Sequence, residues 1–558
     1  MKTLQTIIPL LTILLSCLQL DAQEDTIRHI TTRSTFEAWE DTITYSRLEA
    51  QKDTIIQTRL EVPKSAMSHT VSRPNPLQFG LATARSNEDR FWALCRAHQE
   101  AERLHTNVDY SGVGDITIAI PRDALSIPLT DSNDFQGITI TVVNRTKDFT
   151  LFASSAESLE LKVPMDVINS GDYYLIDTLR RGTKMLIIQD TKPWAERVGH
   201  SYFFNRKDIL LIRNGISDSR TAFPYAKHTS NAKCWLVDVR DDKPCYVKNL
   251  TIRREKNSDY KTSMIALTCR HNVRLDNITV VTPYDGGKYG DAIIKLEDCT
   301  NIRLHNVMID GSYSRSDMFG YGIAANNVRN LQLVNVKSSN CKWSVIGANN
   351  LFNTTLDSCN INGFNILCHG SDVTMCNTLF RDNDIEFTSV GGLIYYSHCT
   401  FHNCVPLYLR PGYNALVPFD VVMKDCTMEA EKLRQRTAIM DMGQISTLTN
   451  NRPELSQKCW PNVTIQNMTI KTGIGTREVD LFYLEGGFNS PHPLAYCSKI
   501  IIEGLMVEGP AKKLRICNGD DIRFQNTVKL NLRYRNTFKS NFELDNNLNL
   551  DAQFNYIE

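Results

Sequence analysis

The strongest constraint on the fold of this chain is a short repeat that runs from Ile265 to Asn377. Each copy has an apolar residue, a gap of eight positions, and then an alternating strand bordered by asparagine. Such repeats cannot bury an apolar face alone and are typical of stacked solenoids. The sequence therefore predicts a β-solenoid with one long face suited to binding a long-chain molecule. Equivalent strand positions, separated by 29, 29, 23 and 19 residues, are Val273, Ile302, Leu331, Thr354 and Val373.

Asparagine marks the expected bends of this solenoid. Asparagine tolerates the left-handed backbone conformation that sharp bends require, so the pattern favours short strands joined by tight turns. The apolar residues that open the repeats are Ile265, Ile294, Ile323 and Ile346. The asparagines before the second strand are Asn272, Asn301, Asn330 and Asn353, and those after it are Asn277, Asn306, Asn335 and Asn377.

Composition argues against a nucleic-acid partner. Among 558 residues, 62 Lys and Arg balance 62 Asp and Glu, so the formal net charge of zero gives no bulk attraction to polyanions. Residues 178–233 depart from this balance, with eleven cations against four acids and a net charge of +7. Two interpretations stay open for this segment, namely solvated solenoid turns or a docking surface for a polyanion.

The amino terminus has the features of an export signal. Lys2 precedes an apolar run from Ile7 to Leu20, which is too short for a membrane span and ends at a small-residue cleavage site before Gln23. Residues 1–22 are therefore expected to be a signal peptide, and the protein is expected to be periplasmic or secreted. An alternative is lipidation of Cys17 in a lipoprotein box, which would anchor the protein at the outer membrane. No other stretch is apolar enough to span a membrane.

The expected domain order is an extension at 23–84, a solenoid at 85–535 and a tail at 536–558. Ser86 can cap a helix, with Asp89 three residues on, and the helix is expected to cover the open end of the solenoid. The 16 cysteines include no metal-binding pair, and those near the asparagine bends are interpreted as apolar fillers of the stacked interior. Strands are expected to recur at Gly137–Val143, Ile209–Ile212, Tyr246–Ile252, Asn462–Ile470, Ser498–Val507 and Thr527–Tyr534.

The helix followed by Ile118-Ala119-Ile120-Pro121 and then by coils with asparagine bends resembles the pectate-lyase-like superfamily of right-handed parallel β-helices. The resemblance covers roughly residues 85 to 530. It implies an exported protein that acts on an acidic polysaccharide, most like bacterial polysaccharide lyases, including those that degrade glycosaminoglycans.

The longer repeats place two loops on one edge of the solenoid. Residues 283–291 and 310–321 occupy the same phase of adjacent coils and should stack, and residues 341–344 add to them. Aromatic residues suit stacking on sugar rings, and cations suit carboxylate or sulfate groups. The expected substrate-binding residues along this edge are Tyr313, Lys342, Trp343, Arg410, Tyr413 and Asp291.

This residue set favours β-elimination from a uronic acid, which needs a base, an acid for the leaving oxygen and a group that neutralises the carboxylate. His369 or Lys288 is the expected base, and Tyr321 or Tyr289 the expected acid. Arg315 and Lys342 are expected to hold the carboxylate. Structural explanations stay open for these residues: a hydrogen bond between coils for His369, shielding of a coil edge at a turn for Tyr289 and Tyr321, and a solvated loop charge for Lys288 and Arg315.

Two alternatives to the lyase stay open. An inverting hydrolase of the polygalacturonase type would use Asp291 with a second carboxylate, although the paired aspartates of that family are missing. A non-catalytic glycan-binding surface protein would use the same aromatic and cationic residues. No resident cofactor is expected; calcium is an alternative whose acidic ligands would be Asp285, Asp291, Asp310 and Asp317.

Overall fold

The structure is a computed structural model. It describes residues 72–144, 149–162, 165–196, 203–222, 232–255, 262–282, 292–311, 320–347, 350–409, 419–430, 438–442, 461–474, 478–484, 497–510, 513–517, 519–525, 530–535, 541–543 and 548–552. The predicted signal peptide, with Cys17, and most of the predicted extension lie outside these ranges. Residues 71–558 belong to one compact unit.

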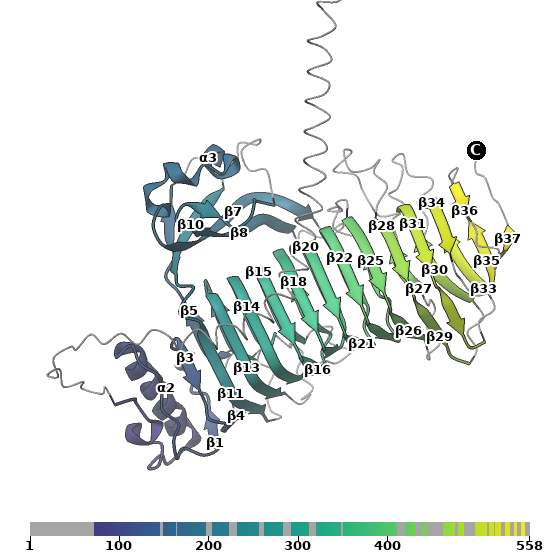
Figure 1. Cartoon of the computed structure of the whole chain (residues 1–558). Coiled ribbons are helices and arrows are strands. Elements are labelled where there is room, and N and C mark those ends of the chain that lie inside the picture. The colour runs from purple at the N-terminus through teal and green to yellow at the C-terminus, as the bar shows by residue number, and fades with distance from the viewer. Residues whose placement is uncertain are drawn as a thin grey trace, which may run out of the picture. The chain divides into compact units, whose positions relative to one another are not determined.

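A helix precedes the first coil, as predicted. After the short 3-10 helix η1 (Pro76–Phe79), helix α2 spans Asn87–Arg103. Its amino end has a reciprocal capping box: the Asp89 amide donates to Ser86 Oγ and the Ser86 amide donates to Asp89 Oδ2, both at 3.0 Å. The apolar side buries Phe91 and Leu94 against the first solenoid strands, so α2 closes the apolar end of the stack (Figure 1).

A fully buried histidine lies under this cap. His98 Nε2 is 2.6 Å from the Tyr110 hydroxyl, and its ring packs against Phe135 and Phe152. Burial lowers the pKa of His98 to about 4, because the charged imidazolium would lose its hydration there.

We expect His98 to make the fold sensitive to acid. Its pKa is lower in the folded than in the unfolded state, so the unfolded chain binds more protons between pH 6.5 and about 4. This contribution to stability is complete above pH 6.5 and falls by about 1.4 kcal/mol per pH unit through that window. Denaturation of wild type and His98→Gln at pH 7 and pH 5 should show a smaller acid loss in the variant. His105→Gln, an exposed histidine near the end of α2, is the matched control.

The remaining chain is mostly a right-handed parallel β-helix, which confirms the predicted fold class (Figure 1). Its described strands are β1 (Ile116–Ala119), β2 (Ile127–Pro128), β3 (Ser132–Asp134), β4 (Thr139–Asn144), β5 (Phe149–Ser155), β11 (Cys245–Arg254), β12 (Thr262–Thr268), β13 (His271–Val281), β14 (Ile294–Asp310), β15 (Tyr321–Val334), β16 (Lys337–Ser339), β17 (Trp343–Gly347), β18 (Asn350–Asp357), β19 (Asn360–Ile361), β20 (Phe364–Cys376), β21 (Leu379–Arg381), β22 (Ile385–Ser397), β23 (Thr400–His402), β24 (Leu407–Leu409), β25 (Phe419–Lys424), β26 (Thr427–Ala430), β27 (Ala438–Met442), β28 (Asn462–Gln466), β29 (Thr469–Thr472), β30 (Glu478–Leu484), β31 (Cys497–Glu503), β32 (Met506–Glu508), β33 (Lys513–Cys517), β34 (Gly519–Gln525), β35 (Leu530–Arg535), β36 (Asn541–Glu543) and β37 (Leu548–Ala552).

Each complete coil contributes strand residues to three faces. Face A contains the first strand of each coil, and faces B and C follow it along the chain. Side chains alternate inward and outward, and the inward ones form one continuous apolar core. The described residues of face A are 265–268, 294–297, 323–326, 345–347, 364–366, 385–387, 407–409, 440–442 and 482–484.

The predicted repeat is confirmed on face B. Val273 pairs with Ile302, which pairs with Leu331, and the series continues through Thr354 to Val373. On face A the prediction is wrong by one residue, because Ile323 pairs with Val345 and not with Ile346. The shorter third coil moves the inward position back by one residue, so Ile346 lies in register with Ala324.

The asparagine bends are also confirmed. Asn277, Asn306 and Asn335 have φ angles of 54°, 54° and 52°, the left-handed region that asparagine tolerates. Their side chains form a ladder across the coils: the Asn306 amide donates to Asn277 Oδ1 at 3.1 Å, and the Asn335 amide donates to Asn306 Oδ1 at 2.6 Å. The same residue type thus makes the bend and links consecutive bends.

A second sheet interrupts the solenoid between β5 and β11. It consists of antiparallel strands in the order β6-β10-β7-β8-β9, and the chain before β7 forms helix α3 (Met165–Ser170) with two 3-10 turns, η2 (Tyr173–Leu175) and η3 (Asp177–Leu179). We call this segment, residues 159–239, the insert. Its strands are β6 (Leu159–Leu161), β7 (Thr183–Glu196), β8 (Phe203–Arg213), β9 (Ile216–Ser217) and β10 (Lys233–Val239).

Residues 159–239 are therefore not coils of the solenoid that was predicted over 85–535, and the prediction of Ile209–Ile212 as a solenoid strand is wrong. Those residues lie in β8, which pairs antiparallel with β7. One side of the inserted sheet packs beneath α3, and the other side packs on Cys269 of the solenoid. Burial on both sides explains why the strand reads as an unbroken apolar run and not as an alternating one.

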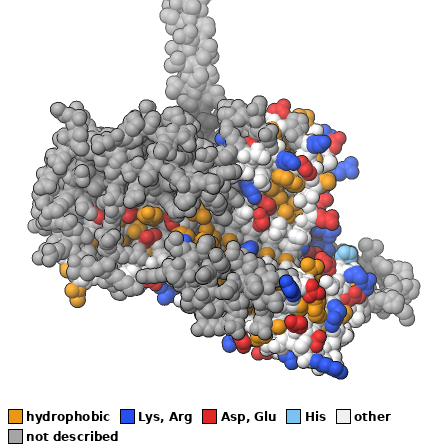
Figure 2. Space-filling model, turned by 180° about the vertical axis from the view of Figure 1, so that it is seen from behind, with side chains coloured by type: hydrophobic (Ala, Val, Ile, Leu, Met, Phe, Trp, Pro, Cys, Tyr) orange, Lys and Arg blue, Asp and Glu red, His pale blue; other side chains and the backbone are white. Residues whose placement is uncertain are grey.

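Carboxylates outside residues 178–233 offset part of the positive charge of that segment. Among the described residues, four of its cations form ion pairs with carboxylates that precede or follow the segment in the chain. On the side shown in Figure 2, the described Lys and Arg side chains are interspersed with Asp and Glu. The pairs are Arg180–Asp177, Lys184–Asp238, Arg213–Asp241 and Lys233–Glu160.

The structure also tests the predicted role of the cysteines and the predicted tail after residue 535. The eleven cysteines whose side chains the structure describes are free thiols, and all of these but Cys376 are buried, which agrees with their interpretation as fillers. The residues expected to form a tail after 535 are not all outside the stack, because β36 pairs in parallel with β34 and β37 with β35. The remaining domain boundaries stay predictions.

Candidate active site on face A

Four of the predicted site residues lie in the described part of the chain: Tyr321, Lys342, Trp343 and His369. The other predicted catalytic and binding residues lie outside it, as do Asp285 and Asp317 of the calcium alternative. Those site residues are Lys288, Tyr289, Asp291, Tyr313, Arg315, Arg410 and Tyr413.

Tyr321, Lys342 and Trp343 meet, as the stacking of coils predicts. We call them the aromatic cluster. Tyr321 begins β15 and is in register with Trp343, which begins β17. Their rings are nearly parallel, with centroids 6.0 Å apart, and Lys342 Nζ lies 4.6 Å from the centre of the Trp343 ring. Each of the three is half-buried, so the cluster offers an aromatic surface and a cation at the start of face A.

The next coils hold this cluster in place. Asn383 donates to the Lys342 carbonyl at 2.7 Å, which fixes the backbone beside Trp343. Gly363 has a φ of 64°, and a Cβ there would lie 3.0 Å from Trp343 Cδ1 and 2.8 Å from Asn383 Cβ. A side chain at 363 would therefore displace both residues, so glycine is required for the close approach.

His369 does not join the aromatic cluster. A register shift in β20 between Ile366 and His369 places the histidine in line with Asn350, whose side chain donates to the Lys207 carbonyl of the insert. His369 is buried with its ring edge-on to Phe352, 5.7 Å between centroids, and burial lowers its pKa to about 4. The bulge moves His369 to the corner next to the insert, so the structure does not bring this expected base together with Tyr321 and Lys342.

The structure reveals a set of polar residues that sequence reasoning missed. Asn365, Glu386, Tyr408 and Asp441 are in register on four consecutive strands of face A. Asn365, Glu386 and Tyr408 each lie between two inward-facing core residues along the strand, and Asp441 directly follows the core residue Met440, so these side chains project from the outer side of the sheet. We call these four residues the polar column.

Two carboxylates in the polar column are almost fully buried. Glu386 and Asp441 are each 6% exposed, while Tyr408 between them is half-buried. Asn365 is completely buried, and neither polar atom of its side chain has a hydrogen-bond partner. A third carboxylate, Asp480 of β30, is 5% exposed and lies on the strand after Asp441. Buried carboxylates on the outer side of a sheet are costly for stability, and such groups gather at functional sites.

The signal for these residues was present in the sequence. Glu386 stands between Ile385 and Phe387, and Asp441 between Met440 and Met442, so each interrupts an apolar triplet at the outward position. Their coils lie beyond the regular repeats, and the intervening segments differ in length. The register that joins these residues is therefore visible only in the folded chain.

Within the described part of the chain, no group of three His, Cys, Asp or Glu side chains is arranged to hold a metal ion. Asp310, the described member of the calcium alternative, accepts hydrogen bonds from Ser339 Oγ at 2.8 Å and Asn340 Nδ2 at 2.7 Å. Of the helices that the structure describes, none has the length and hydropathy of a membrane span.

No protein-family model matches the sequence, and no curated protein matches it. Among solved structures, the chain is similar to the tailspike protein gp49 of Pseudomonas phage LKA1, with 14% identity, a TM-score of 0.53 and coverage of 84% of this chain and 83% of that one. At this identity the likeness supports the β-helix fold alone.

Two weaker likenesses are to tailspikes solved with saccharides. The gp54 tailspike of Acinetobacter baumannii bacteriophage AP22, in complex with a capsular saccharide, has 11% identity and a TM-score of 0.37, and covers 85% of this chain and 76% of that one. The tailspike of E. coli bacteriophage HK620, in complex with a hexasaccharide, has 9% identity and a TM-score of 0.41, and covers 87% and 78%. These TM-scores are too low to support an argument about function.

Proposed function

We propose that this protein binds a polysaccharide along face A and cleaves it by hydrolysis at the polar column. The observation that carries the proposal is the placement of Glu386 and Asp441, two buried carboxylates on the outer side of one sheet, with Tyr408 between them. The predicted export signal at residues 1–22 is consistent with a polysaccharide substrate outside the cytoplasm.

The spacing suits an inverting reaction. Neighbouring parallel strands lie about 4.8 Å apart, so two strand steps separate the backbones of Glu386 and Asp441 by about 10 Å. Inverting glycosidases hold their carboxyl groups about 6.5 to 9.5 Å apart, so that a water molecule fits beside the sugar. The longer Glu386 side chain can shorten the backbone separation toward this range. In such a pair one carboxylic acid protonates the leaving oxygen, and the other carboxylate takes a proton from the attacking water.

The aromatic cluster would hold a neighbouring part of the same polysaccharide. Trp343 lies two strand steps before Glu386 on face A, about 10 Å along the stack. The Trp343 ring can stack on the apolar face of a sugar, and Lys342 can pair with a carboxylate or sulfate on it. Binding and cleavage would then use one continuous surface.

A second candidate function is the predicted lyase reaction, β-elimination from a uronic-acid polysaccharide such as a glycosaminoglycan. The observation that favours it is the meeting of Tyr321 and Lys342, a proton donor and a carboxylate partner, at one end of face A. In this reaction Tyr321 would protonate the leaving oxygen and Lys342 would neutralise the uronate. His369 is a weaker candidate for the base because it lies at the corner beside the insert.

Product chemistry separates these candidates. Purified protein would be incubated, with and without EDTA, with chondroitin sulfates, hyaluronan, heparin, pectate, alginate and bacterial capsular polysaccharides. We expect new reducing ends without absorbance near 232 nm, which is the result for hydrolysis. A rise in that absorbance would instead establish elimination, and loss of activity with EDTA would support calcium. Glycan binding without cleavage of any substrate would leave a binding protein.

Replacing Trp343 by Ala is expected to weaken glycan binding about tenfold, which corresponds to about 1.4 kcal/mol. The variant removes the stacking surface and the partner of the Lys342 cation. Affinity for the cleaved glycan would be measured by calorimetry in a Glu386→Gln background. Tyr174→Ala, which removes an exposed aromatic ring of the insert, is the matched control. Equal affinity of the two variants would remove the aromatic cluster from the binding surface.

A further inference from the structure

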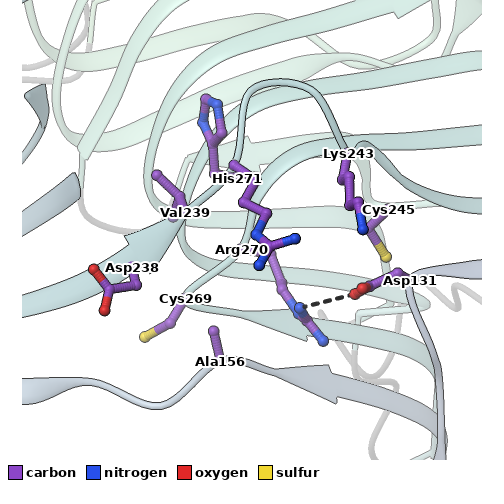
Figure 3. Close-up of a pocket in the computed structure, with 10 residues that line it drawn as sticks. Asp131, Ala156, Asp238, Val239, Lys243, Cys245, Cys269, Arg270 and His271 are labelled. Atoms are coloured by element: carbon purple, nitrogen blue, oxygen red, sulfur yellow. Dashed lines mark ion pairs between the residues drawn. The ribbon is translucent and has the colours of Figure 1, made fainter. Parts of the chain in front are cut away.

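A pocket of about 200 Å³ lies where the insert joins the solenoid, away from the polar column. The chain leaves the solenoid at Ala156 and returns to it between Asp238 and Lys243. The outgoing and the returning segments both line the pocket (Figure 3). The turn at Cys269 and Arg270 completes it from the next coil. A ligand in this pocket would therefore contact the insert and the solenoid together.

Among the Lys, Arg, Asp and Glu side chains that line the pocket, cations outnumber carboxylates. Arg240, Lys243 and Arg270 face two carboxylates, Asp131 and Asp238. Asp238 is engaged by Lys184, a residue that does not line the pocket, so its charge is already balanced. Asp131 forms one ion pair with Arg270, at 3.7 Å, which Figure 3 marks by a dashed line. With Asp238 and Asp131 paired in this way, the positive charges of Arg240 and Lys243 give the pocket lining an excess of cations.

Arg270 has hydrogen-bonding capacity left over. Its Nη2 donates to Ser154 Oγ at 2.5 Å, but its Nε–H is buried and has no acceptor. A buried donor of this kind destabilises the folded protein unless an acceptor reaches it. An anion in the pocket would supply that acceptor.

The other walls of the pocket do not compete for the anion. Burial raises the pKa of the Cys245 and Cys269 thiols to about 11, so both are neutral at pH 7. His271 donates or accepts through both ring nitrogens, to Asp241 at 2.9 Å and to Thr300 at 2.8 Å. Asp241 is itself paired with Arg213. Asp131, Asp238 and Asp241 thus each have a cationic partner.

We propose that this pocket is a second glycan site, which binds one anionic sugar unit through Arg240, Lys243 and Arg270. The volume exceeds that of a single water many times over, since a water needs only about 10–15 Å³ of such space. Guanidinium and ammonium groups together are the partners that carboxylate and phosphate groups take in proteins. That the anionic group belongs to a sugar rests on the proposed function. The assignment of an anion site does not depend on it.

The test is calorimetric titration of the full chain with D-glucuronate, glucose 6-phosphate, inorganic phosphate and glucose at two salt concentrations. We expect saturable binding of at least one anionic sugar, weaker at high salt, and none of glucose. Binding of glucuronate alone would assign a carboxylate, and binding of the phosphate ester alone would assign a phosphorylated sugar. The double variant Arg240→Ala/Lys243→Ala should lose at least about tenfold in affinity, equivalent to about 1.4 kcal/mol. Arg122→Ala, another exposed cation, should not.

Three results would overturn the proposal: no saturable binding of either anionic sugar, even if inorganic phosphate binds; equal binding of glucose; or unchanged affinity in the double variant. Arg240 and Lys243 are exposed, so the double variant is expected to fold. Glu386→Gln should bind the anionic sugar as wild type does, and the double variant should retain polysaccharide cleavage. Failure of this site is thereby distinguished from failure of the active site on face A.

Discussion

Glu386→Gln and Asp441→Asn are each expected to lower the rate of polysaccharide cleavage by at least about a thousandfold, within the usual 10²–10⁴ effect of a positioned acid or base. Each variant keeps the shape of the side chain but removes its ability to exchange a proton. Both positions lie on the outer side of face A and next to core residues, so the solenoid strands should keep their register. The measurement is the rate of formation of reducing ends from the substrate identified in the polysaccharide panel.

Glu297→Gln is the matched control for this experiment. Glu297 is also an outward carboxylate of face A, but it is exposed and accepts a hydrogen bond from Asn326 at 3.1 Å. We expect this variant to cleave at the wild-type rate. Retention of full activity by both Glu386→Gln and Asp441→Asn would refute the polar column as the catalytic site. The aromatic cluster would then be the leading candidate for that site.

Arg329→Ala is expected to loosen the insert from the solenoid by about 3–5 kcal/mol, the usual cost of removing one partner of a buried ion pair. Arg329 Nη2 lies 3.2 Å from Asp208 Oδ1, and Asp208 is completely buried. Arg329 also donates to the Ile209 carbonyl at 2.8 Å and stacks on Phe352, 4.7 Å from its ring centre. The variant leaves a carboxylate in the interface without its cation.

Hydrogen exchange at the amides of β7 and β8 measures this effect directly. A loss of about 3 kcal/mol corresponds to exchange faster by about two orders of magnitude in these strands. The second change Asp208→Asn in the Arg329→Ala background should restore part of the protection, because the buried charge is then gone. Lys471→Ala breaks an exposed pair with Glu429 and is expected to cost no more than about 1 kcal/mol. Equal exchange in Arg329→Ala and Lys471→Ala would show that the buried pair does not hold the insert.

The pH dependence of this interface has the opposite sign to that of His98. Burial raises the pKa of Asp208 to about 6, despite the nearby Arg329 cation. Because that pKa is higher in the folded than in the unfolded state, the folded protein binds more protons between pH 6 and 3.8. The contribution of Asp208 to stability therefore increases as the pH falls through this window and is lost as the pH rises through 6. The defect of Arg329→Ala should accordingly be smaller at pH 5 than at pH 7.5.

Local sequence patterns determined the architecture of the solenoid and of its cap. Apolar alternation and asparagine at Asn277, Asn306 and Asn335 specify strand and bend within each coil, because both depend on neighbouring residues along the chain. The capping box of Ser86 and Asp89 is equally local. The meeting of Tyr321 with Trp343 also followed from the sequence, because both residues lie at the same phase of adjacent coils.

Only the tertiary structure decided which residues share a site where the coils vary in length. Glu386, Tyr408 and Asp441 meet because three strands align, and the intervening segments have different lengths that no fixed repeat predicts. The bulge before His369 and the one-residue offset at Ile346 are changes of register that follow from packing between coils. The insert likewise needed the fold, because Asp208 and Arg329 are far apart in sequence and only burial in a common interface couples them. Strand periodicity is a short-range property of the chain, whereas register between coils is set by the whole stack.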